Sequence, residues 1–207
     1  TRHAELGDKN QVQGRLLLDW QPNDSFSLLI NLNGWTDRGD TQAAQLAYID
    51  LQAPFGSPIA DYPLAPNNAR AADWNPVPLR RRENFWQASA HAQYQVSDAV
   101  ALHSLTSYSK LTTRASQDTD GFAFSNFDAA ILASFIKAFS QEFRVSYTGE
   151  ALNATVGANY GHDRTEDVQS VNFPIASNNR PIPGLVEFDY AVNFGRQKVD
   201  TYAVFAS

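Results

Sequence analysis

The sequence of 207 residues contains no cysteine and no methionine. Without cysteine, the chain has neither a disulfide framework nor a thiolate metal site. No apolar run approaches the roughly 18 residues that a membrane-spanning helix needs, which excludes a helical membrane bundle and leaves a membrane β-barrel open. Charged residues make up 18% and hydrophobic residues 43%, so the chain is not a disordered polar tract. These values predict an all-β or mixed fold.

Basic residues are outnumbered: 16 Lys and Arg stand against 22 Asp and Glu, which gives a net charge of −6. This is the wrong sign for a general phosphate-binding surface, so no nucleic-acid partner is expected. Residues 1–5 lack the basic and apolar pattern of a secretion signal. The absence of an initiator methionine suggests a piece excised from a longer protein.

Apolar and polar side chains alternate with period two along most of the chain, which places one face of each strand against an apolar medium and the other against water. Three strand pairs with tight turns near positions 22, 98 and 149 are predicted, and a seventh strand begins near Gln197. The strand from Val100 to Ser109 is less regular. Leu102 and Leu105 have opposite parity there, which suggests a bulge and leaves its facing open. The residues of apolar parity elsewhere include Val12, Leu16, Leu18, Trp20, Phe26, Leu28, Ile30, Leu32, Trp86, Ala88, Ala90, Ala92, Tyr94, Phe139, Phe143, Val145, Tyr147, Val156, Ala158 and Tyr160.

Short turns alternate with long segments, which are expected at 38–83, 112–136 and 164–196. In an antiparallel meander, this alternation puts every short turn at one rim and every long loop at the other. Outer-membrane barrels have that arrangement, with strands of about 10 residues that are apolar outside and polar inside. We therefore predict an all-β fold: an antiparallel up-and-down transmembrane β-barrel wall of about seven strands, a partial barrel, with long extracellular loops.

Aromatic residues near the ends of the predicted strands fit the belts that meet lipid headgroups, although ordinary core aromatics remain an alternative. These residues are Trp20, Trp86, Tyr94, Tyr108, Tyr147 and Tyr160.

Several short motifs support a more specific interpretation. The run Phe139–Ser146 (FSQEFRVS) resembles a strand signature of TonB-dependent outer-membrane receptors, in which a Gln-Glu-apolar-Arg-apolar core follows a long loop. Ser104–Tyr108, Val156–Tyr160 and Tyr202–Phe205 are similar to neighbouring strands of the same family. The resemblance implies energy-coupled import of a scarce ligand, such as a ferric siderophore or a saccharide, across the bacterial outer membrane.

The resemblance also implies a larger parent protein. Members of this family have 22 strands around a plug domain, and at about 10 residues a strand the wall alone needs ~220 residues. Residues 1–207 are therefore expected to be a fragment of the barrel domain, without the plug. Its expected partners are the small-molecule ligand, the TonB complex through the missing plug, and outer-membrane lipid.

The segment 41–82 holds six prolines together with Tyr62 and Trp74. As an external loop it could clamp a ligand by stacking, and Arg80, Arg81 and Arg82 at its end could attract an anionic ligand. We therefore predict a ligand site at these five residues. The alternative is a solvated cap whose arginines meet lipid phosphates.

Other motifs predict no chemistry. Asp118-Thr119-Asp120-Gly121 resembles the start of a calcium loop, but the remaining ligands are missing, so a solvated turn is expected. The four His residues lack metal-ligand spacing. Glu142 and Arg144 share a strand face, where each is expected to pair with charges on neighbouring strands. Residues 129–133 fit either a short helix or a strand entry.

No cofactor, metal or enzymatic activity is predicted, since the sequence holds no phosphate loop or nucleophile elbow. Two other functions remain open. One is a smaller outer-membrane barrel acting as a porin or adhesin, and the other is a soluble β-sandwich that binds carbohydrate.

Overall fold

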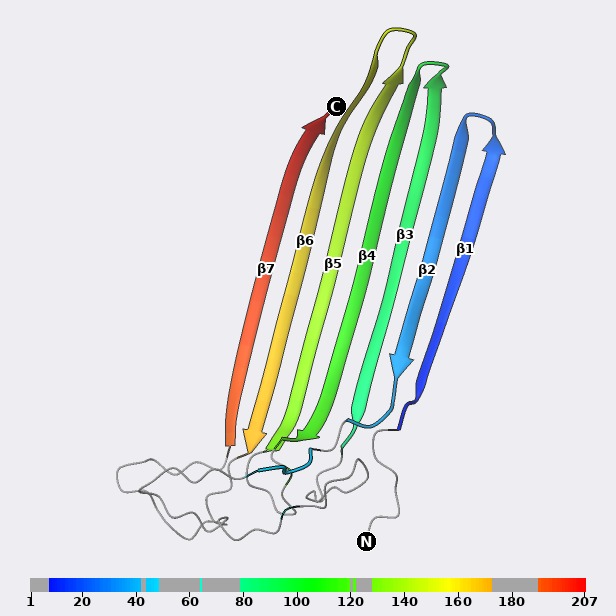
Figure 1. Cartoon of the computed structure of the whole chain (residues 1–207). Coiled ribbons are helices and arrows are strands. Elements are labelled where there is room, and N and C mark those ends of the chain that lie inside the picture. The colour runs from blue at the N-terminus through cyan, green and yellow to red at the C-terminus, as the bar shows by residue number, and fades with distance from the viewer. Residues whose placement is uncertain are drawn as a thin grey trace.

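The computed structural model describes residues 8–41, 44–48, 64, 79–119, 121, 128–172 and 190–207 (Figure 1). Within these ranges the chain forms strands and no helix, and therefore no helix that could cross a membrane. Each strand pairs antiparallel with its sequence neighbours in a 7-stranded sheet of order β1-β2-β3-β4-β5-β6-β7. The strands are β1 (Gln11–Asn23), β2 (Phe26–Asp37), β3 (Arg81–Ser97), β4 (Val100–Asp118), β5 (Asp128–Thr148), β6 (Asn153–Asn172) and β7 (Tyr190–Ala206). The predicted all-β, up-and-down arrangement is confirmed.

The connections separate by length as the sequence predicts. Two-residue turns join β1 to β2 at Asp24–Ser25 and β3 to β4 at Asp98–Ala99, and residues 149–152 join β5 to β6. The Asn23 side chain stabilises the first turn by accepting a hydrogen bond of 3.0 Å from the Ser25 backbone N–H. All three turns lie at one end of the sheet, and the strand ends that lead into the longer connections lie at the other (Figure 1). We call these the turn end and the loop end.

The strands are longer than the roughly 10 residues predicted, reaching 21 residues in β5 and 20 in β6. The long segments expected at 112–136 and 164–196 were therefore wrong in extent, because β4 continues to Asp118, β5 begins at Asp128 and β6 continues to Asn172. Residues 129–133 belong to a strand and not to a helix. Near the loop end the alternation of apolar and polar residues fades while backbone pairing continues, so the hydrophobic pattern alone underestimates the strands.

The predicted bulge between Leu102 and Leu105 is absent. Pairing of β3 with β4 runs without interruption from Arg81 to Gln95, and its one register shift lies beside the turn. The register therefore settles the facing of β4: Leu102 lies on the same face as Tyr94, and Leu105 lies on the opposite face.

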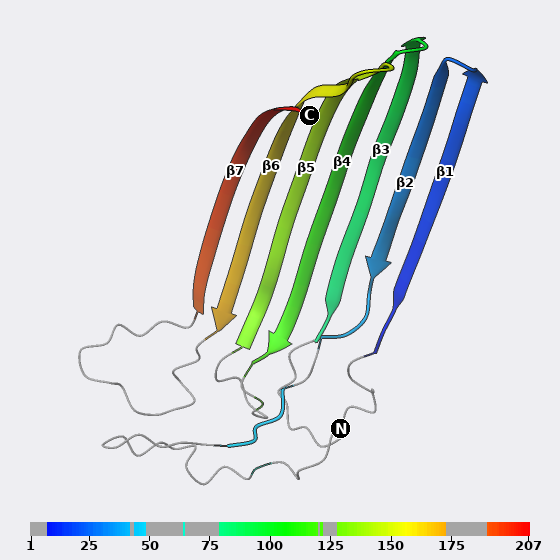
Figure 2. The same cartoon turned by 45° about the horizontal axis from the view of Figure 1, so that its top comes forward.

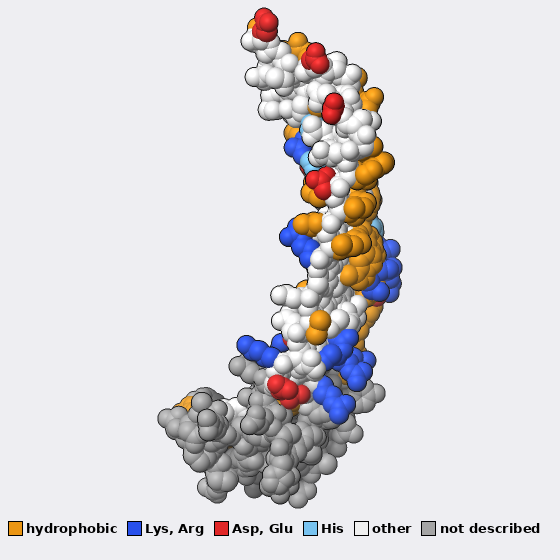
Figure 3. Space-filling view, turned by 90° about the vertical axis from the view of Figure 1, so that its right-hand side faces the viewer, with side chains coloured by type: hydrophobic (Ala, Val, Ile, Leu, Met, Phe, Trp, Pro, Cys, Tyr) orange, Lys and Arg blue, Asp and Glu red, His pale blue; other side chains and the backbone are white. Residues whose placement is uncertain are grey.

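The seven strands lie side by side in a single layer (Figures 1 and 2). Hydrophobic side chains gather on the outer side of the curved wall (Figure 3). They remain open: Leu16 is 62% exposed, Phe143 60% and Val156 58%. Among the described residues, only Leu79 and Val171 are buried hydrophobic side chains. The sheet thus has an apolar face that nothing in the described ranges covers, and we call the opposite side the polar face.

The sheet is not closed, because β1 and β7 each pair with a strand on one side only. Unpaired N–H and C=O groups along such edges are a ready template for further strands.

Candidate functional site

The polar face carries a lattice of hydrogen bonds between side chains on neighbouring strands. Arg15 Nε donates to Asn31 Oδ1 at 2.8 Å, linking β1 to β2. Asn33 Nδ2 donates to Gln87 Oε1 at 3.1 Å, and Gln87 Nε2 reaches Ser107 Oγ at 3.4 Å, which links β2, β3 and β4. Because these amides and hydroxyls bond across strands, they form a continuous hydrophilic surface that still offers donors and acceptors to solvent.

An apolar shelf interrupts this surface towards the loop end. The Trp35 and Phe85 rings stack with centroids 6.1 Å apart and planes 24° apart. Leu111 and Ile136 extend the shelf over β4 and β5, because all four residues are in register. A flat aromatic surface beside hydrogen-bonding groups can hold a planar or sugar-like ligand. Sequence alternation does not reveal this pair, because only the cross-strand register brings Trp35 and Phe85 together.

A hollow of about 690 Å³ lies on this part of the sheet. It combines aromatic surface with amide and guanidinium donors, the mixture typical of small-molecule sites. Its lining residues are Gln13, Gly14, Arg15, Asn31, Asn33, Gly34, Trp35 and Gln87.

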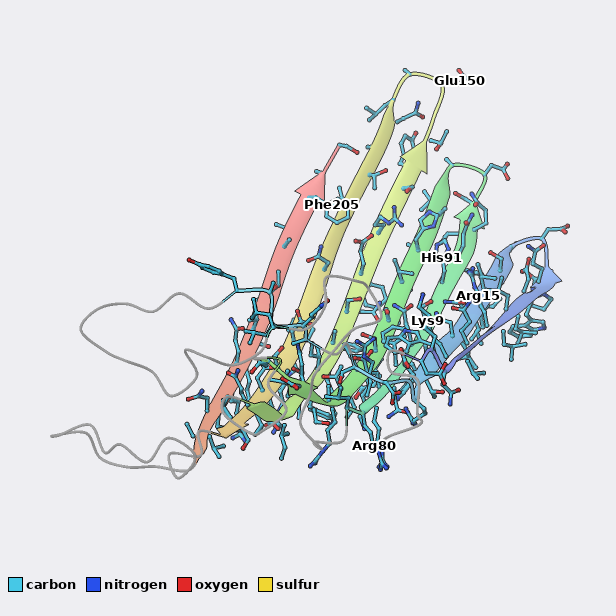
Figure 4. The ribbon with its side chains drawn as sticks, turned by 60° about the horizontal axis from the view of Figure 1, so that its bottom comes forward. Lys9, Arg15, Arg80, His91, Glu150 and Phe205 are labelled. Carbon is cyan, nitrogen blue, oxygen red and sulfur yellow. The ribbon has the colours of Figure 1, made fainter. Side chains whose placement is uncertain are left out.

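The three consecutive arginines are separated rather than brought together. Arg80 is exposed at the loop end (Figure 4). Arg81 lies on the polar face, 3.8 Å from Asp37 and 3.8 Å from Glu83. Successive side chains on a strand point to opposite faces, so Arg82 lies on the apolar face, opposite Arg114 in register.

Of the predicted ligand residues, Arg81 alone is therefore shown to share the polar face with the aromatic shelf. It precedes Phe85 by four residues and lies ~13 Å nearer the loop end on the same face of β3. Tyr62 and Trp74 lie outside the described residues.

The charge pairing predicted for Glu142 and Arg144 is wrong in its partners. Arg144 Nε lies 2.9 Å from Glu142 Oε1, so the two residues pair with each other along β5. Side chains two residues apart on a strand share a face, which lets a long guanidinium fold back onto its neighbour. This pair places two opposite charges on the polar face and leaves its net charge unchanged.

The solvated turn predicted at residues 118–121 is also wrong. Asp118 is fully buried at the end of β4, and its Oδ1 accepts a 2.8 Å hydrogen bond from the Gly121 N–H. Gly121 has a φ of 72°, a left-handed conformation that glycine adopts without strain. The carboxylate thus stabilises the local chain at the loop end.

Across the ranges that the structure describes, no three His, Asp or Glu side chains are grouped closely enough to hold a metal ion. No family model, curated protein or solved structure matches the chain. Function must therefore be argued from the two faces of the sheet.

Proposed function

We propose that this sheet is part of the barrel wall of a TonB-dependent receptor in the bacterial outer membrane, and that the parent protein imports a scarce ligand. The observation that carries the proposal is a single-layer sheet with an open apolar face and a hydrogen-bonded polar face. Lipid would cover the first face, and the second would line an aqueous lumen.

Two rows of aromatic side chains border the apolar face. The turn-side row comprises Trp20, Phe26, Tyr94 and Tyr147, and the loop-side row comprises Trp86, Tyr108, Phe139, Tyr160 and Tyr202. Ring contacts occur within both rows, at 5.7 Å for Trp20–Phe26 and 5.1 Å for Tyr160–Tyr202. On β3 the rows are eight residues apart, about 27 Å along the strand. At a strand tilt of about 35° this corresponds to ~22 Å in height, close to the roughly 25 Å apolar band of an outer-membrane barrel.

The positions of the turns supply an independent argument. Phe26, Tyr94 and Val145 lie in one row across the sheet, because strand pairing aligns them. Phe26 is next to its turn at Ser25, whereas Tyr94 lies four residues before the turn at Asp98 and Val145 four residues before the turn at Gly149. Averaged over the two strands of each hairpin, the distance from this row to the middle of the turn grows by about 4 residues between the β1–β2 hairpin and the β5–β6 hairpin. That is ~13 Å along the strands for the ~19 Å that four strand spacings span across the sheet. If the turns share one membrane surface, the strands tilt by about 35°, within the range of membrane barrels.

Polar side chains near the middle of the apolar face satisfy one another. Gln141 Nε2 donates to Ser104 Oγ at 3.0 Å, and Gln141 Oε1 accepts from the Thr106 hydroxyl. Hydrocarbon offers no hydrogen bonds, so polar groups in contact with lipid must pair within the protein. The arrangement favours a lipid-facing surface.

The chemistry of the polar face fits capture and passage of a ligand. The Trp35–Phe85 shelf and Arg81 lie towards the loop end, where a ligand would arrive from outside. The amide and hydroxyl lattice on the polar face, nearer the turn end, offers a hydrated path for the ligand. The open β1 and β7 edges require further strands, and the resemblance supplies the plug and TonB coupling that gate such a path.

Cysteine scanning tests the membrane setting, since the chain has no native cysteine. In the full-length protein, spin labels are placed at Phe143 and Val156 on the apolar face and at Glu142 and Asn159 on the polar face. We expect the first pair to collide with dissolved oxygen and the second pair with a water-soluble nickel complex. Labels on the apolar face that are shielded from both reagents would instead indicate a second packed sheet, and the lipid-facing assignment would fail.

Uptake of radiolabelled ferric siderophores and oligosaccharides tests the transport role. Deletion of the gene should abolish uptake of one of these compounds, and a protonophore should abolish it in the parent strain. Uptake that requires the gene but survives the protonophore would favour a passive porin.

A further inference from the structure

Four basic side chains form a line across the apolar face. Lys110, Lys137, Arg164 and Lys198 lie directly opposite one another on β4, β5, β6 and β7. We call them the cation row. Directly opposed residues have Cβ atoms about 4.5–5.5 Å apart, a spacing at which like charges repel. The row concentrates positive charge on one surface of a chain whose net charge is −6.

The three lysines of the row form no ion pair with a carboxylate of the described residues. The Nζ atoms of Lys110 and Lys137 lie 5.2 and 5.0 Å from the centroid of the same Phe135 ring, which places both ammonium groups on the apolar face. Within the described part of the chain, no carboxylate lies within ion-pair distance of Lys110, Lys137 or Lys198.

The acidic side chains near the row have other partners. Glu166 pairs with Arg164 and lies 2.8 Å from Arg196 Nε. It lies on the loop side of the apolar band, and its hydrogen bond with Arg164 holds the pKa of the carboxyl below its ordinary value. Asp200 accepts a 3.0 Å hydrogen bond from the Tyr160 hydroxyl. Glu166 thus neutralises part of the guanidinium charge. Asp200, which also lies 2.8 Å from His162 Nδ1, is two residues from Lys198 on the same face of β7 and offsets part of the charge of that lysine. Lys110 and Lys137 have no described carboxylate within ion-pair distance.

The cation row lies at the loop-side border of the apolar face. Lys110 is opposite Trp86 in register, and Tyr108 and Phe139 lie two residues closer to the turns. The cation row thus borders the loop-side aromatic row, where hydrocarbon gives way to headgroups in a membrane. The turns at the other end carry Asp24, Asp98 and Glu150 instead, and Figure 3 shows acidic side chains at that end and Lys and Arg nearer the loop end.

We infer that the cation row binds the phosphate groups of lipid headgroups in the outer leaflet. The inference rests on the membrane setting proposed above. Phosphate oxygens accept charge-assisted hydrogen bonds from ammonium and guanidinium groups, and their negative charge relieves repulsion along the row. Three strand spacings extend the row over ~14 Å, which suits a headgroup that carries more than one phosphate. The long lysine side chains keep their stems on the apolar surface while their charges reach the headgroup layer.

The test measures lipid binding by the full-length protein after extraction from outer membranes in mild detergent. The probes are lipid A with two phosphates and the same lipid after phosphatase treatment, and bound lipid is counted by native mass spectrometry. The row variant carries Lys110→Gln and Lys137→Gln. A matched control, Lys9→Gln with Arg144→Gln, removes the same charge away from the apolar face, since Arg144 lies on the polar face of β5. A second variant with Lys110→Arg and Lys137→Arg keeps the charge.

We expect the row variant to bind phosphorylated lipid A about thirtyfold more weakly, since each surface cation contributes roughly fivefold to such binding. The control and the arginine variant should bind as wild type does, and phosphatase treatment of the lipid should remove the difference. Equal binding by wild type and row variant would overturn the inference. So would displacement of the lipid by equimolar inorganic phosphate, which would assign the row to a soluble anion.

Membrane fractionation separates this inference from the function on which it rests. If the protein is recovered in the outer membrane but does not prefer phosphorylated lipid, the inference alone fails. If the wild-type protein is soluble and monomeric, the membrane function fails, and the lipid site fails with it.

Discussion

The facing of β6 gives the sharpest test of the proposed membrane setting. Phe143 lies on β5, four residues from Tyr147 and four from Phe139, and is therefore midway between the two aromatic rows. Its register partner on β6 is Ala158, which is exposed on the apolar face. The next residue, Asn159, lies on the polar face opposite Glu142. These adjacent positions on β6 should respond oppositely to a charge.

Arginine is the perturbation. Ala158→Arg should lower the free energy of unfolding by about 2–4 kcal/mol, the cost of arginine at the midplane on the lipid face of a barrel. Val156→Arg lies one step, ~6 Å in height, nearer the turn-side interface and should cost less, about 1–3 kcal/mol. Asn159→Arg should change stability by less than about 1 kcal/mol, because it enters a polar surface opposite a carboxylate.

The assay is denaturant unfolding of the full-length protein in lipid vesicles, followed by tryptophan fluorescence. Ala158→Leu serves as the control, since it adds bulk on the same face without charge and should be tolerated. A difference of 2 kcal/mol corresponds to about thirtyfold in the folding equilibrium and is readily measured. If Asn159→Arg destabilises the protein as much as Ala158→Arg does, the assignment of the two faces is refuted.

Two further predictions concern single contacts. A Cβ at Gly157 would overlap the Phe205 ring and lie 2.8 Å from the Phe143 backbone oxygen. Gly157→Ala should therefore lower the free energy of unfolding by roughly 1–3 kcal/mol, whereas Gly161→Ala, with no atom nearer than 3.6 Å, should not. Equal melting temperatures for the two variants would contradict the packing. Asp118→Ala should leave the Gly121 N–H without this acceptor and lower the free energy of unfolding by roughly 1–3 kcal/mol. Asp118→Asn keeps an acceptor oxygen and should largely restore stability. Unchanged hydrogen exchange at the Gly121 N–H in the alanine variant would refute this role of Asp118.

Strand periodicity was readable from the sequence because alternation is a local property. The parity of Val12 to Trp20, of Phe26 to Leu32 and of Trp86 to Tyr94 identified the apolar face before any pairing was known. The three short turns were readable because Asn, Asp and Gly have turn preferences of their own. Chain order and turn length together then determined the up-and-down order.

Local patterns failed where the contacts of a side chain in the folded chain decide its role. Glu142 and Arg144 were expected to find partners across the sheet, but they bond to each other along β5. Asp118 was expected to be solvated, but it is fully buried and accepts a hydrogen bond from the Gly121 N–H. The extensions of β4 and β6 towards the loop end were missed because both of their faces carry polar residues. The start of β5 was missed because apolar residues occupy both of its faces, which also removes the alternation.

The sequence by itself determined the number of described strands, their antiparallel order and the face to which most side chains belong, because each follows from short-range alternation and turn chemistry. Register was decided only by the tertiary structure, since a strand can slide along its partner by two residues without changing the face of any side chain. That register stacks Trp35 on Phe85 and aligns Lys110, Lys137, Arg164 and Lys198 in one row.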